Sequence, residues 1–370
     1  MPSFDLALRY PASGTLCRIR VARGGLSGLG PWTKRTTGAH RVAVVSDHHV
    51  SALFGESAVR GLRRSGIDAA LVTVPAGERT KSVLHLERLW RQFSEIGLVR
   101  SDAIVAMGGG VVGDLAGFAA ATWLRGVPWV NVPTSVVAQV DSAIGGKTAI
   151  DVAGGKNLAG SFHQPAGVLI DPDALVTLPD REFRAGLAEV VKTGMAVDAG
   201  LFRWLERHAG HVLAREPDAL LEIVRRAVRA KSRVVIGDER EREAGGRTAL
   251  NFGHTVGHGL ESVFGLRRLR HGEAVAIGMH VAAILSASVA GLPLAEQERL
   301  DALLERLGLP IAIPPGVRVA VLGAAIRRDK KRDRSGTRWV LTPRVGHASV
   351  PRLISGRRVR AALCEAGAWA

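Results

Sequence analysis

The chain has 370 residues, 46% hydrophobic and 23% charged, which is typical of a folded globular protein with room for two domains and excludes a disordered chain. The net charge of +16 favours an acidic partner, but the arginines are scattered and no nucleic-acid-binding signature occurs, so we expect an anionic small molecule and no nucleic acid. Cys17 and Cys364 are too few for a disulfide scaffold, and no signal peptide is read, so we expect a cytoplasmic protein.

In the first half of the chain, short apolar strands alternate with amphipathic helices. Strands are predicted at residues 17–21, 41–46, 69–74, 102–107, 129–132 and 168–170, and helices at 50–65, 81–96 and 115–121, with a further short helix bearing Gln139 and Asp141. The short connections predict an α/β, Rossmann-like domain with a parallel sheet covered on both faces. Such sheets bind ligands beyond the carboxyl ends of their strands.

A glycine-rich turn, Gly108-Gly109-Gly110, follows one of these strands and precedes a helix. Glycines let the backbone approach a ligand closely, and a helix amino terminus offers free N–H groups to a pyrophosphate. A structural tight turn is the competing interpretation, because the G-x-G-x-x-G fingerprint is absent. Asp47, at the end of an earlier strand, is placed to hold a ribose hydroxyl.

A second glycine cluster, Gly145-Gly146-Lys147-Thr148, resembles a phosphate-binding loop of nucleotide triphosphatases. We reject that interpretation because position 141, where the loop needs its first glycine, is Asp. The linker at 171–179 contains two prolines and is the predicted boundary between a domain of residues 1–178 and a domain of residues 179–370.

The second half is predicted to be mostly α-helical. Helices are predicted at residues 181–197, 201–213, 218–235, 255–263, 273–290 and 294–307, and a late strand pair at 339–341 and 347–350. The stretch 274–292 is apolar enough to suggest a membrane span. It carries His280 and many small residues, so we predict a buried helix and no membrane partner.

Three histidines, His254, His258 and His271, fall within twenty residues. A single histidine is usually a core or capping residue, but three close together predict a metal site, and the first two share a helix face. Upstream, Glu189 and Lys192 are three apart among apolar neighbours. This spacing usually means a solvated salt bridge; here the surroundings predict a partly buried pair that needs a partner or a metal.

Only eight of the 50 basic residues are lysines. Arginine is therefore the default cation, and each lysine marks a place where a compact ammonium is needed, unless the placement is chance. The lysines are Lys34, Lys81, Lys147, Lys156, Lys192, Lys231, Lys330 and Lys331.

Ordered motifs run from about residue 42 to residue 332. They are Val-Val-Ser-Asp47, Pro75-Ala-Gly-Glu78-Arg-Thr-Lys81, Gly-Gly-Gly-Val-Val-Gly-Asp114, Leu124-Arg125-Gly126, Gln139-Val-Asp141, Gly-Gly-Lys147-Thr, Gly-Lys156-Asn157, Ala-Gly-Leu-Ala-Glu189-Val-Val-Lys192, Lys231, Asp238-Glu239-Arg240, Asn251-Phe-Gly-His254-x-x-x-His258, His271-Gly-Glu and Arg328-Asp-Lys-Lys331. Together they resemble the 3-dehydroquinate synthases of the sugar phosphate cyclase family.

The resemblance implies an NAD-binding first domain, a helical metal- and substrate-binding second domain, and a homodimer. The implied cofactors are NAD+ and Zn²⁺ or Co²⁺. The implied reaction converts 3-deoxy-D-arabino-heptulosonate 7-phosphate, a small phosphorylated sugar acid, to 3-dehydroquinate and phosphate. NAD+ is not consumed, because the hydroxyl that it oxidises is reduced again after phosphate leaves.

The resemblance also implies residue roles. Glu189, His254 and His271 would bind the metal, and His258 would be an acid–base group with Asn251 holding substrate hydroxyls. The substrate would be surrounded by Asp141, Lys147, Asn157, Lys192, Lys231 and Arg247, by Arg125 of a second subunit, and by one of Lys330 and Lys331. NAD+ would be contacted by Asp47, Glu78, Lys81, Gly109, Gly110, Val111, Asp114, Thr134, Ser135, Lys147, Lys156 and Thr177.

Two other functions share parts of this pattern. One is another sugar phosphate cyclase acting on a different substrate, and the second is a metal-dependent alcohol or glycerol dehydrogenase with a similar fold and glycine turn. The combination of Lys231, Arg247, Asn251 and His258 favours dehydroquinate formation over another cyclase, and the lysine-rich pocket with a glutamate ligand disfavours the dehydrogenase. A basic nucleic-acid-binding protein is suggested by the charge alone.

Overall fold

The computed structural model describes residues 3–153, 155–242, 246–265, 268–329, 337–349 and 352–369. The chain divides into two compact units. The first comprises Met1–Leu178 with Leu220–Val228, and the second comprises Pro179–Ala219 with Arg229–Ala370. The prediction of an α/β portion followed by a mostly helical portion is confirmed.

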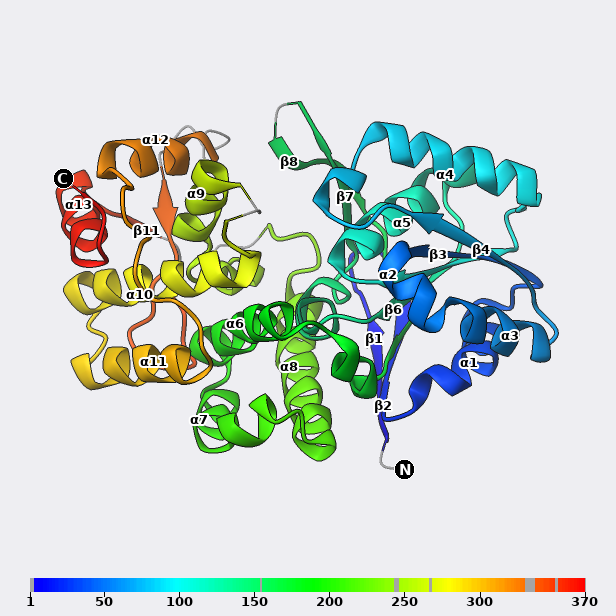
Figure 1. Ribbon diagram of the computed structural model, residues 1–370, viewed down its shortest axis with the longest axis horizontal. Helices are drawn as coiled ribbons and strands as arrows, with labels where there is room; N and C mark the ends of the chain where they lie inside the picture. Colours follow the sequence, from blue (N-terminus) through cyan, green and yellow to red (C-terminus); the bar gives the residue numbers. More distant parts are fainter. Residues whose placement is uncertain are drawn as a thin grey trace. The chain divides into compact units, whose positions relative to one another are not determined.

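The first unit is built on a seven-stranded sheet of order β1-β2-β9-β6-β5-β3-β4, in which only β1 and β2 are antiparallel (Figure 1). The strands are β1 (Ser3–Arg9), β2 (Leu16–Ala22), β3 (Arg41–Asp47), β4 (Asp68–Val74), β5 (Ala103–Gly108), β6 (Trp129–Pro133) and β9 (Gly167–Ile170). The parallel sheet predicted from the apolar runs is confirmed, and β1 was not predicted.

Alternate residues of the central strands pack into separate cores on the two faces of the sheet. On β3, Val42 and Val44 pack with α1 (Leu29–Thr37) and α3 (Glu56–Arg64). Ala43 and Val45 pack with α4 (Val83–Ile96) and α5 (Gly110–Thr122) on the opposite face (Figure 1). This period of two in a fully buried strand explains why β3 is apolar throughout.

The chain order reverses between β5 and β3, near the β4 edge of the sheet. Strand β3 pairs with β4 on one side and with β5 on the other. The crevice that forms where strand order reverses is the usual ligand-binding position in such sheets. Asp47 ends β3 and Gly108 ends β5, so the acidic residue and the glycine turn picked out in the sequence lie at neighbouring strand ends.

A two-stranded hairpin of β7 (Lys147–Val152) and β8 (Gly155–Phe162) was not predicted. It lies outside the main sheet, and β8 is largely solvent-exposed. The segment before it, predicted as a helix, is a short π-helical turn, Ala138–Ser142. The glycine-rich, polar sequence of the hairpin lacks the alternation of a half-buried strand, so a pattern search overlooks it.

The second unit contains helices α6 (Asp180–Val197), α7 (Ala199–Leu213), α8 (Pro217–Gly237, whose middle turns group with the first unit), α9 (His254–Phe264), α10 (His271–Val289), α11 (Leu294–Arg306), α12 (Val319–Asp329) and α13 (Gly356–Glu365). Of these, α12 and α13 were not predicted. The predicted strand pair is wrong in its second member: β10 (Arg338–Trp339) pairs with β11 (Arg352–Leu353), and described residues of 347–350 form no strand.

Helix α10 is long and apolar enough to cross a membrane, and it is the one such helix among the described residues. The 18-residue window that meets this test is 72% buried inside the protein. Its apolar residues belong to the core that α9, α12 and α13 complete. The prediction that this stretch is a buried helix is therefore confirmed.

Glycines allow α10 to touch its neighbours backbone to backbone. A Cβ atom on Gly272 would lie 1.7 Å from the carbonyl oxygen of Ala185 in α6, and one on Gly278 would lie 2.0 Å from that of Gly253. Gly253, which precedes α9, has a φ of +81° and also packs against α10. No other residue type fits these contacts without moving a helix.

We predict that Gly272→Ala destabilises the protein by roughly 3 kcal/mol, because the added methyl group must displace α10 from α6. Thermal or urea unfolding measures the change. Gly210→Ala is the matched control, since its Cβ would meet nothing closer than 4.0 Å and alanine favours a helix. Equal stability of the two variants would contradict the packing role of Gly272.

Candidate functional site

Three residues of the second unit bring potential metal ligands together. Glu189 lies in the middle of α6, whereas His254 and His271 are the first residues of α9 and α10. One ligand atom from each lies within 4.8 Å of the others. The Nε2 atoms of His254 and His271 face the same oxygen of Glu189, at 3.6 and 3.3 Å. One carboxylate and two imidazoles form a ligand set suited to zinc, with positions left for other ligands.

The carboxylate of Glu189 is fully buried, and neither of its oxygens accepts a hydrogen bond within the described structure. The ammonium of Lys192 lies 2.6 Å from Oε2, also buried. The sequence predicted a partly buried pair, and the structure buries both residues almost completely. A buried carboxylate without directed hydrogen bonds requires compensating charge, and a divalent cation beside the imidazoles would supply it. The residues therefore fit a metal centre.

Burial and neighbouring charge set the ionisation of the three groups. Burial opposes ionisation of Glu189, but the charge of Lys192 and the neighbouring imidazoles outweigh it and hold the carboxyl pKa well below its usual range. Burial lowers the pKa of His254 to about 3, so this imidazole is neutral and offers a lone pair. For His271, burial is outweighed by contacts with Glu189 and Glu261, which raise its pKa to about 10.

His258 lies beside this group without belonging to it. It is one helical turn after His254, and its ring centroid is 5.3 Å from that of His254 and 6.4 Å from that of His271. The three residues whose ligand atoms converge are Glu189, His254 and His271. The histidine stretch by itself suggested a metal site of three imidazoles. The structure instead brings His254 and His271 together with Glu189, which lies on another helix.

Glu261 is a buried acidic residue that sequence reasoning missed. Its Oε1 lies 3.4 Å from Nδ1 of His271. The available signal was the spacing 254, 258, 261, which places three polar side chains on one face of an otherwise apolar helix. The contact itself could not be read from the sequence, because His271 is on a different helix.

The segment before α9 carries two further predicted residues. Arg247 is buried, and its guanidinium donates a hydrogen bond to the carbonyl of Glu239 at 2.8 Å. The backbone N–H of Arg247 donates a hydrogen bond to the carboxylate of Asp238, which links Asp238 to the segment before α9. The amide of Asn251 donates to the carboxylate of Glu241 at 2.8 Å.

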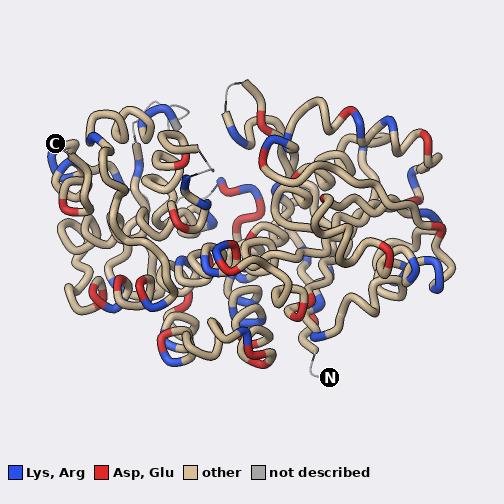
Figure 2. The backbone as a smooth tube through the Cα atoms, viewed as in Figure 1, with Lys and Arg blue, Asp and Glu red and all other residues tan. Residues whose placement is uncertain are grey.

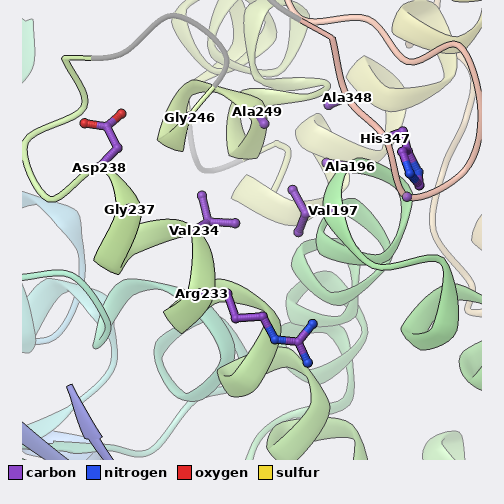
Figure 3. A pocket seen from close by; sticks show the side chains of 11 residues that line it. Ala196, Val197, Arg233, Val234, Gly237, Asp238, Gly246, Ala249, His347 and Ala348 are labelled. Carbon is purple, nitrogen blue, oxygen red and sulfur yellow. The ribbon is translucent and has the colours of Figure 1, made fainter.

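A pocket of about 390 Å³ lies at the carboxyl ends of α6 and α8, with His347 on the segment opposite (Figure 3). The carboxylate of Asp238 in its wall is occupied by the N–H groups of Arg242 and Arg247. The wall is mostly small side chains, and it includes none of the site residues predicted from the sequence. The lining residues are Ala196, Val197, Arg233, Val234, Gly237, Asp238, Gly246, Ala249, Gly346, His347 and Ala348.

In the first unit, the glycine turn leads directly into α5. Gly109 is the N-cap residue and makes no side-chain cap, so the N–H groups of Gly110 and Val111 begin the helix. A Cβ on Gly109 would lie 3.5 Å from the hydroxyl of Ser135, and one on Gly110 would lie 3.1 Å from that of Ser142. This arrangement of helix N–H groups and hydroxyls fits a pyrophosphate. Ser142 was not predicted.

A buried lysine joins three predicted residues of the first unit. The ammonium of Lys81 lies 2.7 Å from the carboxylate of Asp114, donates to the amide oxygen of Asn157, and lies 3.8 Å from Glu78. Burial opposes its charge, but Asp114 and Glu78 outweigh burial and raise the pKa of Lys81. Glu78 also lies 3.9 Å from Lys156. Segments 76 residues apart in sequence thus meet at one ammonium.

The remaining predicted residues are placed as follows. Asp47 caps the helix after β3, accepting from the N–H groups of residues 49 and 50. Thr134 and Ser135 follow β6, Asp141 lies in the π-helical turn, Lys147 begins β7, and Thr177 ends a 3₁₀ helix where its hydroxyl donates to the carbonyl of residue 174. Lys231 is buried in α8. Lys330 and Lys331 lie outside the described residues.

Two of the predicted residues have strained backbones. Arg125 has a φ of +69° and Asn157 one of +55°, values that non-glycine residues rarely adopt. Arg125 follows Leu124, which also has a positive φ, and both side chains are exposed. Strain of this kind persists where the surrounding structure imposes it, and it concentrates at functional positions.

Basic residues are distributed over both units. In the view of Figure 2, basic and acidic segments are scattered along the chain, with uncharged stretches between them. Several arginines lie against carboxylates, and Arg225 and Arg226 share the single carboxylate of Glu222.

Solved structures with the same architecture include 2-epi-5-epi-valiolone synthase from Streptomyces hygroscopicus, with NAD+ and Zn²⁺ bound. It is 29% identical and superposes with a TM-score of 0.85 over 94% of this chain and 96% of the other. A 2-deoxy-scyllo-inosose synthase shares the fold: it is 23% identical and superposes with a TM-score of 0.88 over 98% of this chain and 99% of the other. Glycerol dehydrogenase from Schizosaccharomyces pombe also shares the fold, at 20% identity and a TM-score of 0.67 over 97% of this chain and 89% of the other. Together with the Glu189, His254 and His271 cluster, this defines the class: an enzyme of the sugar phosphate cyclase type.

Family models resolve the class further. Residues 71–185 match the 3-dehydroquinate synthase N-terminal model, and residues 186–332 match the 3-dehydroquinate synthase C-terminal model. The chain is 47% identical over 336 residues to the 3-dehydroquinate synthase of Pelobacter propionicus, covering 90% of this chain and 92% of the relative. It is 45% identical over 357 residues to that of Symbiobacterium thermophilum, covering 95% and 96%. The chain belongs to the 3-dehydroquinate synthase family, and the resemblance carried by its motifs is confirmed.

We predict that zinc raises the melting temperature of the metal-stripped protein, because a ligand that binds the native state stabilises it. His254→Ala should abolish the rise by removing a ligand. His258→Ala should keep it, since its ring stands beside the converging donors. Calorimetry with and without added zinc measures both, and loss of the rise in both variants would show that the ligand set is wrong.

Proposed function

We propose that this chain converts 3-deoxy-D-arabino-heptulosonate 7-phosphate to 3-dehydroquinate and inorganic phosphate, the second step of the shikimate pathway of aromatic amino acid biosynthesis. It is then an NAD- and metal-dependent, phosphate-eliminating lyase. The observation that carries the proposal is the Glu189, His254 and His271 cluster in a chain 47% identical, over 90% of its length, to a protein of that name.

The proposed metal ligands are Glu189, His254 and His271, and the proposed ion is Zn²⁺ or Co²⁺. When bound there, the ion supplies a Lewis acid for the hydroxyl to be oxidised and for the ketone that it becomes. The neutral imidazole of His254 and the ionised carboxylate of Glu189 are the protonation states that ligation requires. The zinc-bound synthase from Streptomyces hygroscopicus supports this choice of metal.

The proposed NAD+ site is in the first unit. Gly109, Gly110 and Val111 would give N–H groups to the pyrophosphate, as their position at the start of α5 supports. NAD+ bound there supplies a reversible oxidant that is regenerated in each turnover. The other proposed contacts are Asp47, Glu78, Lys81, Asp114, Thr134, Ser135, Lys147, Lys156 and Thr177.

The proposed substrate contacts are polar side chains. In the second unit, Lys192 would offer a compact cation to the substrate beside Glu189, and His258 would hold or receive the proton that leaves the substrate. Asn251 would hold substrate hydroxyls, and its amide is already fixed by Glu241. The further proposed contacts are Asp141, Lys147, Asn157, Lys231, Arg247, Lys330 and Lys331.

We further propose that the working assembly is a homodimer in which Arg125 acts on the substrate of the partner copy. The support is local. Arg125 and Leu124 are both exposed, and both hold positive φ values at the end of α5. An arginine held in a fixed backbone conformation on the surface is suited to reach outside its own subunit.

Incubation with the heptulosonate 7-phosphate, NAD+ and zinc tests the function. We expect stoichiometric phosphate release with no net NADH, and its loss when a chelator removes the metal. Another cyclase would release no phosphate from this substrate. Accumulation of NADH with a simple alcohol would instead identify a dehydrogenase.

We predict that Lys192→Arg lowers kcat/KM at least tenfold, about 1.4 kcal/mol of transition-state stabilisation, because a planar guanidinium cannot replace a point cation in a packed site. Steady-state kinetics measure the loss. Lys34→Arg is the matched control, since Lys34 is exposed and its ammonium donates to the backbone carbonyl of Ser65 at 3.2 Å, away from the proposed site residues of the described structure. A wild-type rate in Lys192→Arg would contradict the need for lysine there.

A further inference from the structure

Glu261 and Glu189 face opposite nitrogen atoms of one imidazole. Nε2 of His271 lies 3.3 Å from Oε1 of Glu189, and Nδ1 of the same ring lies 3.4 Å from Oε1 of Glu261. Both carboxylates are buried. Helix α9 therefore supplies one proposed ligand at its first residue, His254, and two turns later a carboxylate behind the other proposed ligand, His271 on α10.

We propose that Glu261 is a positioning residue of the metal centre. Its carboxylate accepts a hydrogen bond from Nδ1–H of His271 and holds the ring toward Glu189, so that Nε2 is the nitrogen that offers a lone pair once a metal ion displaces its proton. This inference rests on the proposed metal ligation by Glu189, His254 and His271.

His254 and His271 differ in the group that faces the Nδ1 atom of each ring. Nδ1 of His254 faces the backbone carbonyl of Phe252 at 3.3 Å, a neutral acceptor at the start of the same helix. Nδ1 of His271 faces the charged Glu261. A carboxylate behind an imidazole increases its basicity as a ligand more than a carbonyl does. Glu261 therefore makes His271 the stronger donor of the pair.

Exposure explains why His271 needs this support. The side chain of His271 is 35% exposed, against 12% for His254 and 0% for Glu189. Burial restrains the two inner groups in addition to their polar contacts, whereas the outer ring is partly open to solvent. A hydrogen bond from a buried carboxylate restrains the ring where side-chain packing does not.

Two substitutions separate orientation from charge. Glu261→Ala removes both the acceptor and the charge, whereas Glu261→Gln keeps an acceptor oxygen and removes the charge. We expect zinc affinity, measured by competition with a chromophoric chelator, to fall roughly 10–100-fold in Glu261→Ala. Glu261→Gln should lie between this variant and the wild type. Glu305→Gln, an exposed glutamate of α11, is the control and should match the wild type.

The cobalt-loaded protein gives a readout that a merely structural role would not change. Altered hydrogen bonding to His271 changes the ligand field, so the visible absorption of Co²⁺ should shift in both Glu261 variants and stay unchanged in Glu305→Gln. If Glu261→Ala fails to fold, the nearly isosteric Glu261→Gln carries the test by itself.

His271→Ala distinguishes this inference from the function on which it rests. If the wild type and His271→Ala bind zinc equally, the proposed metal centre is wrong. If His271→Ala loses zinc while both Glu261 variants keep the wild-type affinity and cobalt spectrum, the metal centre stands and the role of Glu261 is refuted. Weakened zinc binding with a shifted spectrum in Glu261→Gln supports the proposal.

Discussion

The backbone contact of α10 with α6 and α9 sets the geometry on which the candidate metal centre depends. Gly272 places the start of α10 against the carbonyl of Ala185, one helical turn before Glu189 on α6. Gly278 and Gly253 bring α9 against α10 at the residue that precedes His254. Each glycine is adjacent to a proposed ligand or lies on the helix that a ligand begins. Three ligands from three helices meet because those helices approach more closely than any side chain would allow.

The burial of Glu189 explains why charged groups surround the cluster of Glu189, His254 and His271. Glu189 is completely enclosed, so its carboxylate is stable only with cations close by, and Lys192 at 2.6 Å is one of them. A divalent ion held by the carboxylate and the two imidazoles, as we propose, would add positive charge, and the carboxylate of Glu261 on the other side of the His271 ring would offset part of it. Compact positive groups are needed here because space is limited, which gives a physical reason for lysine in a chain that otherwise uses arginine.

Much of the fold follows from local patterns. The apolar runs at β3 and β5 predicted buried parallel strands, and the period of α10 predicted a core helix, because both signals are repeated over many neighbouring residues. The hairpin of β7 and β8 was missed since β8 is largely exposed and the sequence is rich in glycine and polar residues. The late strand pair was assigned the wrong partner for a related reason. Two-residue strands such as β10 are defined by their pairing and carry no pattern of their own.

The sequence by itself indicated the family, the alternation of strands and helices in the first half, the helical second half and the partial burial of Glu189 with Lys192, because residue types, spacing and periodicity are properties of the chain. Only the tertiary structure decided which side chains meet. It brought Lys81 to Asp114 and Asn157 across 76 residues, and it placed Glu261 behind His271. Such contacts depend on how closely two helices or strands pack and at what register. The packing distance and the register are set by the shapes of both contacting surfaces together, so the sequence of one segment does not determine them.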